Sequence, residues 1–257
     1  MTLLAVASAK ASPGASTLAL ALAATWPREG LSEAWLLEAD PDGGSVAALR
    51  TLRHDPGLMS LAASRVMDLE AIRAHVQMLD TDLGVLIGHA SADQATAVIA
   101  SVVGRLGPWT AAQSSLQVIA DLGRVSPRSP AIGFARAADA VLLVLRPQLD
   151  EVVHVAHRAQ ALRDAGCTTG LVLIGDRPYG PEEVSEAAQC EVFGVVADDR
   201  HGAAILRGQP GRTKTLLRSG LWRSVVELGA TLHGRFTPVV APVAADGVSR
   251  DEEAVLS

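Results

Sequence analysis

Short apolar runs rich in leucine, isoleucine and valine alternate along the chain with longer, alanine-rich segments of helical periodicity. The short runs predict strands over residues 3–7, 34–38, 83–87, 116–120, 140–145, 171–174 and 192–196. The longer segments predict helices over residues 16–25, 92–105, 149–165, 181–188 and 214–233. Nearly continuous apolar strands separated by helices are typical of a parallel sheet covered on both faces. The pattern therefore predicts an α/β fold, with a mostly parallel sheet and helices on both faces.

Two parts of the chain depart from this alternation. Residues 45–80 fit short helices better than strands. Residues 236–257 combine prolines with the acidic cluster at 251–253, a composition that predicts a mostly disordered tail. Between the two ends there is no clear domain boundary or internal repeat, so we expect a single domain over residues 1–235.

Composition narrows the class of protein. The chain has 257 residues, of which 49% are hydrophobic, enough for one large domain with a buried core. The net charge of -6 does not favour binding to nucleic acid or anionic lipid. No apolar run reaches the roughly 18 residues of a membrane span. Cys167 and Cys190 lack C-x-x-C spacing and are typical of buried thiols in a reducing compartment. We therefore expect a cytoplasmic protein.

A candidate phosphate-binding loop joins the first expected strand to the first expected helix. A strand, a tight turn and a helix N-terminus direct backbone N–H groups and the helix dipole towards an anion. A complete P-loop reads G-x-x-x-x-G-K-[ST], and residues 9–16 here read AKASPGAS. Gly14 and Ser16 keep the second glycine and the hydroxyl. Ala9 replaces the first glycine, and Ala15 replaces the lysine that grips the phosphates.

The loss of the lysine at Ala15 weakens any nucleotide site. One charge-assisted contact to a phosphate contributes roughly 1.5–3 kcal/mol, or about 10–100-fold in affinity. Pro13 also removes one N–H donor. Gly14 and the N–H groups of Ala15, Ser16 and Thr17 remain. The loop therefore predicts weak nucleotide binding and weak or absent hydrolysis, with a fully decayed site as the equal alternative.

Polar residues follow three further strands at the edge where ligands of parallel sheets bind. The acidic segment 38–45 reads EADPDGGS, Asp121 closes the fourth expected strand, and Arg146 and Pro147 follow the fifth. Asp121 stands where a Walker-B carboxylate holds Mg²⁺ directly or through water, and Ser16 would supply the other metal contact. Taken singly, the acidic segment also has the composition of an ordinary turn.

These patches together resemble the MinD/ParA family of deviant Walker A ATPases. Lys10 falls on the early "signature" lysine of that family's loop. Residues 38–44 look like its aspartate-rich switch, with Asp40 on the second acidic position. Residues 121–123 are similar to its Walker-B-like segment, and residues 138–147 to the strand that follows.

The resemblance runs over most of residues 1–210 and extends to the base-contacting segment. Residues 173–178 occupy the place of that segment, but Gly175 and Asp176 stand where relatives often have an asparagine. In the family, ATP lies between two protomers, and the signature lysine reaches across to the partner's phosphates. Hydrolysis resets the dimer, which positions chromosomes, plasmids, division-site proteins or pilus machinery.

The resemblance thus implies a homodimer that binds ATP or ADP with Mg²⁺ and an unidentified protein partner. Lys10 and Asp40 would act in catalysis, and Ser16, Asp40 and Asp121 would hold the metal. The implied nucleotide contacts are Lys10, Ala11, Ser12, Gly14, Ala15, Ser16, Thr17, Asp121, Arg146, Pro147 and Asp176.

The residues leave other functions open. Only two of the 22 basic side chains are lysines, Lys10 and Lys214, so a lysine in the loop points to a role for a compact charge. A competent ATPase that uses Lys10 in place of the lost lysine is one alternative, and a nucleotide-free interaction scaffold is another. A dinucleotide-dependent dehydrogenase is disfavoured, because no G-x-G-x-x-G follows the first strand.

A basic stretch near the C-terminus is compatible with nonspecific DNA binding. No acidic residue interrupts it, and phosphate neutralisation is what such binding requires. A solvated helix face is the favoured interpretation, given the acidic total. The stretch consists of Arg207, Arg212, Lys214, Arg218 and Arg223.

Overall fold

The computed structural model describes residues 3–10, 13–28 and 33–236. In this part of the chain, eight strands form one sheet in the order β3-β4-β2-β5-β1-β6-β7-β8. All neighbouring strands are parallel except β3 and β4, which are antiparallel. The strands are β1 (Leu3–Ser8), β2 (Glu33–Glu38), β3 (Gln77–Asp80), β4 (Leu83–Leu86), β5 (Leu116–Arg124), β6 (Ala140–Leu145), β7 (Thr169–Ile174) and β8 (Val192–Val196).

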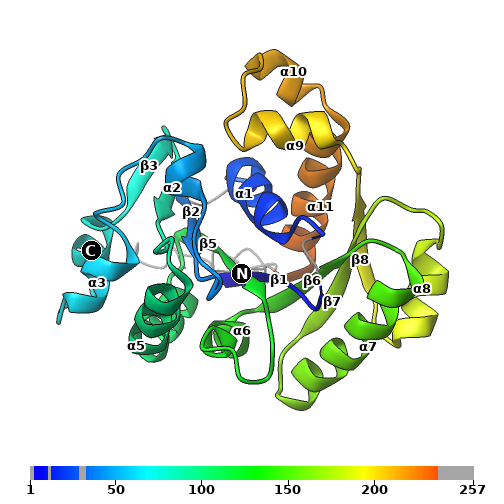
Figure 1. Ribbon diagram of the computed structural model, residues 1–257, viewed down its shortest axis with the longest axis horizontal. Coiled ribbons are helices and arrows are strands. Elements are labelled where there is room, and N and C mark those ends of the chain that lie inside the picture. The colour runs from blue at the N-terminus through cyan, green and yellow to red at the C-terminus, as the bar shows by residue number, and fades with distance from the viewer. Residues whose placement is uncertain (1–2, 11–12, 29–32, 237–257) are drawn as a thin grey trace, which may run out of the picture.

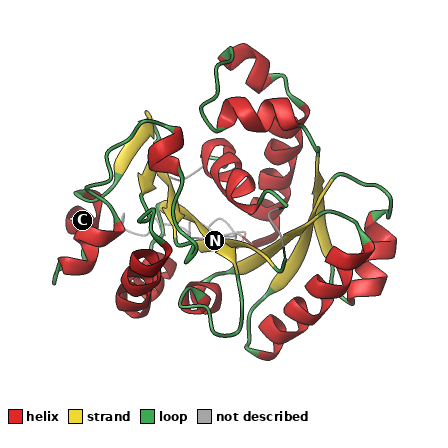
Figure 2. Cartoon of the chain, in the orientation of Figure 1, coloured by secondary structure: helices red, strands yellow, loops and turns green. Residues whose placement is uncertain are grey.

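Helices cover both faces of the sheet, as Figures 1 and 2 show. The helices are α1 (Ala15–Thr25), α2 (Val46–Leu49), α3 (Leu58–Ala63), α4 (Leu69–Arg73), α5 (Ala92–Ala111), α6 (Ile132–Ala137), α7 (Leu149–Asp164), α8 (Pro181–Ala188), α9 (Arg200–Leu206), α10 (Thr213–Leu217) and α11 (Gly220–Phe236).

The alternation of side chains along β1 divides the core into two layers. Leu3, Ala5 and Ala7 pack with buried residues of α3, α5, α6, α7 and α8. Leu4 and Val6 point to the other face and pack with α1, α2, α9, α10 and α11. Every residue of β1 is buried, which explains why the strand reads as a continuous apolar run. The mostly parallel, two-sided α/β fold expected from the sequence is confirmed.

Several expectations differ from the structure. Residues 45–80, where we expected short helices more than strands, form the short helices α2, α3 and α4 and also a strand, β3. It is a half-exposed edge strand whose residues alternate in burial, so it lacks an apolar run. β5 continues through Asp121 to Arg124 instead of ending at residue 120, because Asp121 and Leu122 are themselves buried.

The helix expected over 214–233 is two helices, α10 and α11. Ser219 and Asp199 provide the second start: the Ser219 hydroxyl accepts from the Trp222 N–H at 3.1 Å, and Asp199 accepts from the Leu221 N–H at 3.4 Å. Side-chain acceptors of this kind satisfy the free N–H groups of a helix N-terminus. Phe236, placed in the expected tail, ends α11 and packs on Phe193 with ring centroids 5.8 Å apart. The rest of the tail, 237–257, lies outside the described residues.

Close packing of β7 on β8 makes a first prediction. A Cβ built on Gly170 would lie 2.2–2.4 Å from ring carbons of Phe193. We expect Gly170→Ala to lower the free energy of unfolding by about 1–3 kcal/mol, because the buried ring has to move. Gly104→Ala in α5, where a Cβ meets nothing within 4 Å, should instead be neutral or stabilising by roughly 0.5–1 kcal/mol. Urea titrations compare them; equal midpoints for the two variants would contradict this packing.

Candidate nucleotide-binding site

The turn between β1 and α1 presents backbone donors at the carboxyl edge of the sheet. Gly14 caps α1 in the left-handed conformation, with φ 109° and ψ 22°, and a Cβ there would meet nothing within 4 Å. The first helical hydrogen bond runs from the Leu18 N–H to the Gly14 carbonyl at 2.8 Å. The N–H groups of Ala15, Ser16 and Thr17 therefore precede the helical hydrogen bonds and have no backbone acceptor among the described residues. Ala11 and Ser12 lie outside the described residues.

Asp121 connects this turn to the centre of the sheet. The residue is 4% exposed. Its carboxylate accepts a hydrogen bond from the Gly123 N–H at 3.0 Å. Burial raises the pKa of Asp121 to about 7, against a lowering by the nearby Ser16 hydroxyl, and the nearby carboxylates of Asp40 and Glu38 also raise it. Ser16 itself is exposed, so the buried Asp121 lies beneath an exposed residue at this edge of the sheet.

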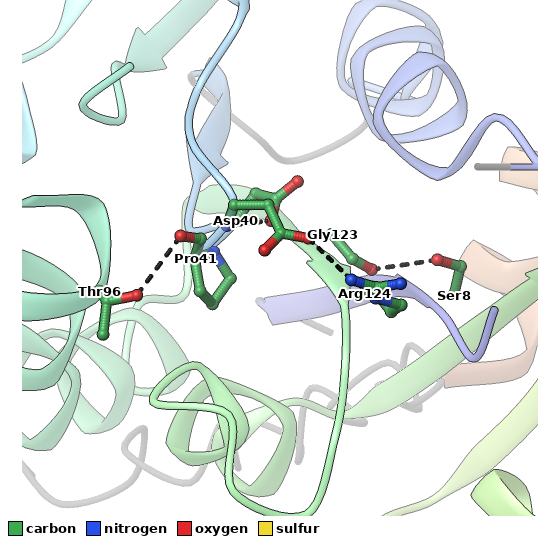
Figure 3. Close-up of polar contacts among 7 residues, drawn as sticks. Ser8, Asp40, Pro41, Thr96, Gly123 and Arg124 are labelled. Atoms are coloured by element: carbon green, nitrogen blue, oxygen red, sulfur yellow. Dashed lines mark hydrogen bonds and ion pairs between the residues drawn. The ribbon is translucent and has the colours of Figure 1, made fainter. Parts of the chain in front are cut away.

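Asp40 lies directly against the backbone of β5 (Figure 3). A Cβ on Gly123, whose φ is +57°, would come within 2.0–2.2 Å of the Asp40 carboxylate, so only glycine allows this approach. Beside it, Asp42 pairs with Arg124 at 3.5 Å, and the Ser8 hydroxyl donates to the Gly123 carbonyl at 3.5 Å. Burial raises the pKa of Asp40 above its usual range. Carboxylates from two strand ends thus meet next to the β1–α1 turn.

Glu38 has a different part in the site. It is 2% exposed, and its carboxylate accepts from the N–H groups of Ser45 and Val46 at 2.9 Å and of Gly88 at 3.1 Å. Burial raises the pKa of Glu38, although these hydrogen bonds oppose the shift. Three backbone donors indicate that Glu38 holds the acidic segment and the end of β4 together.

A cavity of about 370 Å³ opens over these groups. Gly14, Thr17 and Arg207 also line a neighbouring cavity of about 420 Å³, in which Ile174 and Val196 offer apolar surface. The first cavity is lined by Ser8, Gly14, Ala15, Ser16, Thr17, Asp40, Asp42, Ser45, Gly123, Arg124 and Arg207.

A third cavity, of about 600 Å³, adjoins the second. Arg146, Ile174 and Asp198 line both of them, and Asp176 lines the third. Pro147 is not among the residues that line the three cavities in the described part of the chain. The cavities form a groove that runs from the β1–α1 turn to the ends of β7 and β8.

Lys10 is paired with a residue of α7. Its ammonium group forms an ion pair with Asp150, in the first turn of α7, at 3.0 Å. Both side chains are largely exposed, at 42% and 61%. This pair lowers the pKa of Asp150. Within the described residues, Lys10 does not line the three cavities.

The residues present fit a nucleotide with Mg²⁺ in most respects. The open space at Gly14 and the N–H groups of Ala15, Ser16 and Thr17 form an anion cradle. The Ser16 hydroxyl and the Asp121 carboxyl are suitable oxygen ligands for Mg²⁺. Among the described residues, no group of three or more His, Cys, Asp or Glu side chains is arranged to hold a metal ion. Metal binding here would therefore depend on phosphate oxygens as well.

Sequence reasoning missed several residues of the groove. Arg124, Asp42 and Asp198 line it without having been named as contacts, and Arg207 was placed in the basic stretch, where a solvated helix face was the favoured interpretation. The first three are close in sequence to Asp121, to Asp40 and to the end of β8, so proximity to those strand ends was an available signal. Arg207 gave no such signal, because α9 was not predicted.

Among the described helices, none combines the length and apolar composition that crossing a bilayer requires.

The raised pKa of Asp121 predicts a pH-dependent stability. The folded chain holds the proton more tightly than the unfolded chain, so this stabilisation is fully present below about pH 4 and is lost as the pH rises through about 7. Without metal or nucleotide, Asp121→Asn removes the titration. Its stability relative to wild type should rise by on the order of 2–3 kcal/mol between pH 5 and pH 8.

Denaturant titrations at the two pH values measure this change. Asp93→Asn, which removes an exposed carboxyl in the first turn of α5, is the control and should show no comparable rise. A stability difference for Asp121→Asn that is the same at both pH values would contradict the assignment of a buried, protonated carboxyl.

Comparisons with known proteins place the fold. No protein-family model matches the sequence, and no curated protein does. The structure is similar to the Pyrococcus furiosus cell division ATPase MinD, with a TM-score of 0.73 and 17% identity, covering 91% of this chain and 100% of that chain. It is also similar to the ParA family ATPase from Chlorobium tepidum TLS, with a TM-score of 0.71 and 15% identity over 90% and 98% of the two chains.

A third similar structure is the septum site-determining protein MinD from Pyrococcus horikoshii OT3, in complex with Mg-ADP. Its TM-score is 0.68 at 16% identity, and the match covers 90% of this chain and 95% of that chain. At these identities the likeness concerns the fold. The chain therefore has the α/β P-loop NTPase fold of the MinD and ParA ATPases, as the sequence led us to expect.

Proposed function

We propose that this chain is a MinD/ParA-like nucleotide-binding protein with a regulatory or positioning role and with weak or absent ATP hydrolysis. The observation that carries the proposal is the anion cradle at Gly14, next to the exposed Ser16 and the buried Asp121, with only a methyl group at position 15. These features support a site that keeps backbone contacts to phosphate and lacks the phosphate-gripping lysine.

The groove supports binding of a whole nucleotide. The cavity over Gly14 would take the phosphates, and the neighbouring cavity between Ile174 and Val196 would take the nucleoside. Mg²⁺, when bound, supplies charge neutralisation between phosphate oxygens. The MinD from Pyrococcus horikoshii was determined with Mg-ADP, which supports the same ligand class here.

The chain's own residues divide the work. Backbone N–H groups of the first turn of α1 bind and orient phosphate oxygens. Ser16 and Asp121 would contact the metal, and Asp40 would hold a water on the side facing β5. We propose that Asp176 and Arg146 contact the base or sugar from the outer cavities, which they line.

Slow hydrolysis follows from the charges at the phosphate end. Ala15 adds no positive charge there. Lys10 is paired with Asp150, so within one protomer its ammonium group is engaged by that carboxylate. We propose that Lys10 contacts nucleotide only if the pair with Asp150 opens, as it would when a second protomer approaches this edge.

Partners and location belong to the same proposal. We propose a cytoplasmic homodimer that acts on a separate protein partner, and a single domain over residues 1–235. A MinD from Aquifex aeolicus has been determined in complex with MinC, which supports partner binding as a property of this fold. DNA contact would involve the exposed cations of α10 and its flanks, Arg212, Lys214 and Arg218.

Nucleotide titration tests the function. Calorimetry with Mg-ATP and Mg-ADP should give saturable but weak binding, and Ala15→Lys should tighten it about 10–100-fold by restoring one charged contact. Ala112→Lys adds the same charge at the exposed end of α5 and should have no effect. No saturable binding at millimolar ligand would reject the proposal and leave an interaction scaffold.

The rate of ATP hydrolysis distinguishes the proposed weak or absent activity from that of a competent ATPase. Phosphate release by the wild type should be close to background and unchanged in Lys10→Ala. Robust hydrolysis that Lys10→Ala abolishes would instead establish an ATPase in which Lys10 replaces the lost lysine.

A salt-dependent mobility shift on DNA tests the basic stretch separately. If binding occurs through phosphate neutralisation at α10, the triple substitution of Arg212, Lys214 and Arg218 by glutamine should abolish it. Unchanged binding in that variant would place any DNA contact elsewhere on the protein.

A further inference from the structure

One arginine, from a helix that the sequence did not predict, lies between the two cavities at the start of α1. Arg207 caps the C-terminal end of α9 and lines both the 370 Å³ and the 420 Å³ cavities. Gly14 and Thr17 of the phosphate loop line the same two cavities. Arg207 is exposed, and among the described residues it forms no ion pair. Its guanidinium group is therefore available at the junction of the phosphate and nucleoside ends.

The backbone around Arg207 is held in place by contacts with the end of α2. The Arg50 guanidinium donates to the Leu206 carbonyl at 2.8 Å. Gly208 has φ +95° and lies so close to the Leu49 carbonyl that a Cβ would come within 2.2 Å. A glycine at this close approach and a hydrogen bond to the preceding residue fix the end of α9 against the end of α2. Arg207 thus extends from a fixed position.

The 370 Å³ cavity contains acidic side chains, and among the described residues its lining has only one cation besides Arg207. Its lining includes Asp40 and Asp42, and Asp121 lies beneath it. Of the two cations in the lining, Arg124 is paired with Asp42. Ala15 contributes no charge. A nucleoside diphosphate or triphosphate brings further negative charge, and the unpaired cation available to it in the lining is Arg207.

We propose that Arg207 provides, from α9, the cationic phosphate contact that the loop lacks at Ala15. This inference rests on the proposed function, since it requires that the groove binds a nucleotide. A guanidinium group suits the role, because its planar fork can donate two hydrogen bonds to phosphate oxygens. Arg207 is then a nucleotide-binding residue and not part of a DNA-binding surface.

The test compares Arg207→Gln with Arg65→Gln, a matched loss of charge at an exposed arginine between α3 and α4 that does not line the three cavities. Titration calorimetry with Mg-ATP and Mg-ADP should show about 10–100-fold weaker binding for Arg207→Gln and unchanged binding for Arg65→Gln. Adenosine has no phosphate. Its affinity, measured by competition with a fluorescent nucleoside probe, should therefore be the same in wild type and Arg207→Gln.

A rescue experiment identifies the role of the charge. Ala15→Lys introduced into Arg207→Gln should recover at least tenfold of the lost affinity, because it restores a cation to the same cavity. Thermal melts show whether the variants stay folded. We expect Arg207→Gln to stay folded, because the Arg207 side chain is exposed.

Two negative results have different meanings. The role of Arg207 is overturned if wild type and Arg207→Gln bind Mg-ATP equally well. It is also overturned if Arg207→Gln loses as much affinity for adenosine as it loses for Mg-ATP. In both cases the nucleotide-binding function stands. If wild type shows no saturable binding, the proposed function itself fails, and the role of Arg207 with it.

Discussion

The site depends on one buried carboxyl group in the middle of the sheet. Asp121 lies inside β5 and is 4% exposed. A buried carboxyl is costly unless it is hydrogen-bonded, and the Gly123 N–H donates to it at 3.0 Å. Ser16, whose hydroxyl acts on the pKa of Asp121, belongs to the first turn of α1, so the start of that helix lies over the end of β5. The orientation of the anion cradle follows from this requirement.

The sheet could be predicted because parallel strands are buried on both faces. Such strands appear in the sequence as apolar runs, and β6 and β8 begin and end where those runs do. β3 is an edge strand with alternating exposure and carries no such run. Short helices such as α6 and α9 have too few residues for a clear period, so their existence depends on tertiary packing and not on local sequence.

The site was predictable where chemistry follows a strand directly. Gly14, Ser16, Asp40 and Asp121 come together because parallel strands place their carboxyl ends at one edge. The structure gives Lys10 a partner that sequence could not indicate, since Asp150 is 140 residues away. Arg207 likewise reaches the groove only through the packing of α9 against α2. Long-range contacts of this kind leave no pattern in a single sequence.

The hydrogen bonds of Glu38 have a consequence for motion. Its carboxylate holds Ser45 and Val46 at one end of the acidic segment and Gly88 at the end of the neighbouring strand. Residues 40–44 therefore form a loop whose two ends are held in place by Glu38 and its hydrogen bonds. We expect a ligand that moves Asp40 to bend residues 40–44 while the ends held by Glu38 stay in place. Two contacts would carry such a movement further: the Thr96 hydroxyl of α5 donates to the Pro41 carbonyl, and Asp42 pairs with Arg124 of β5.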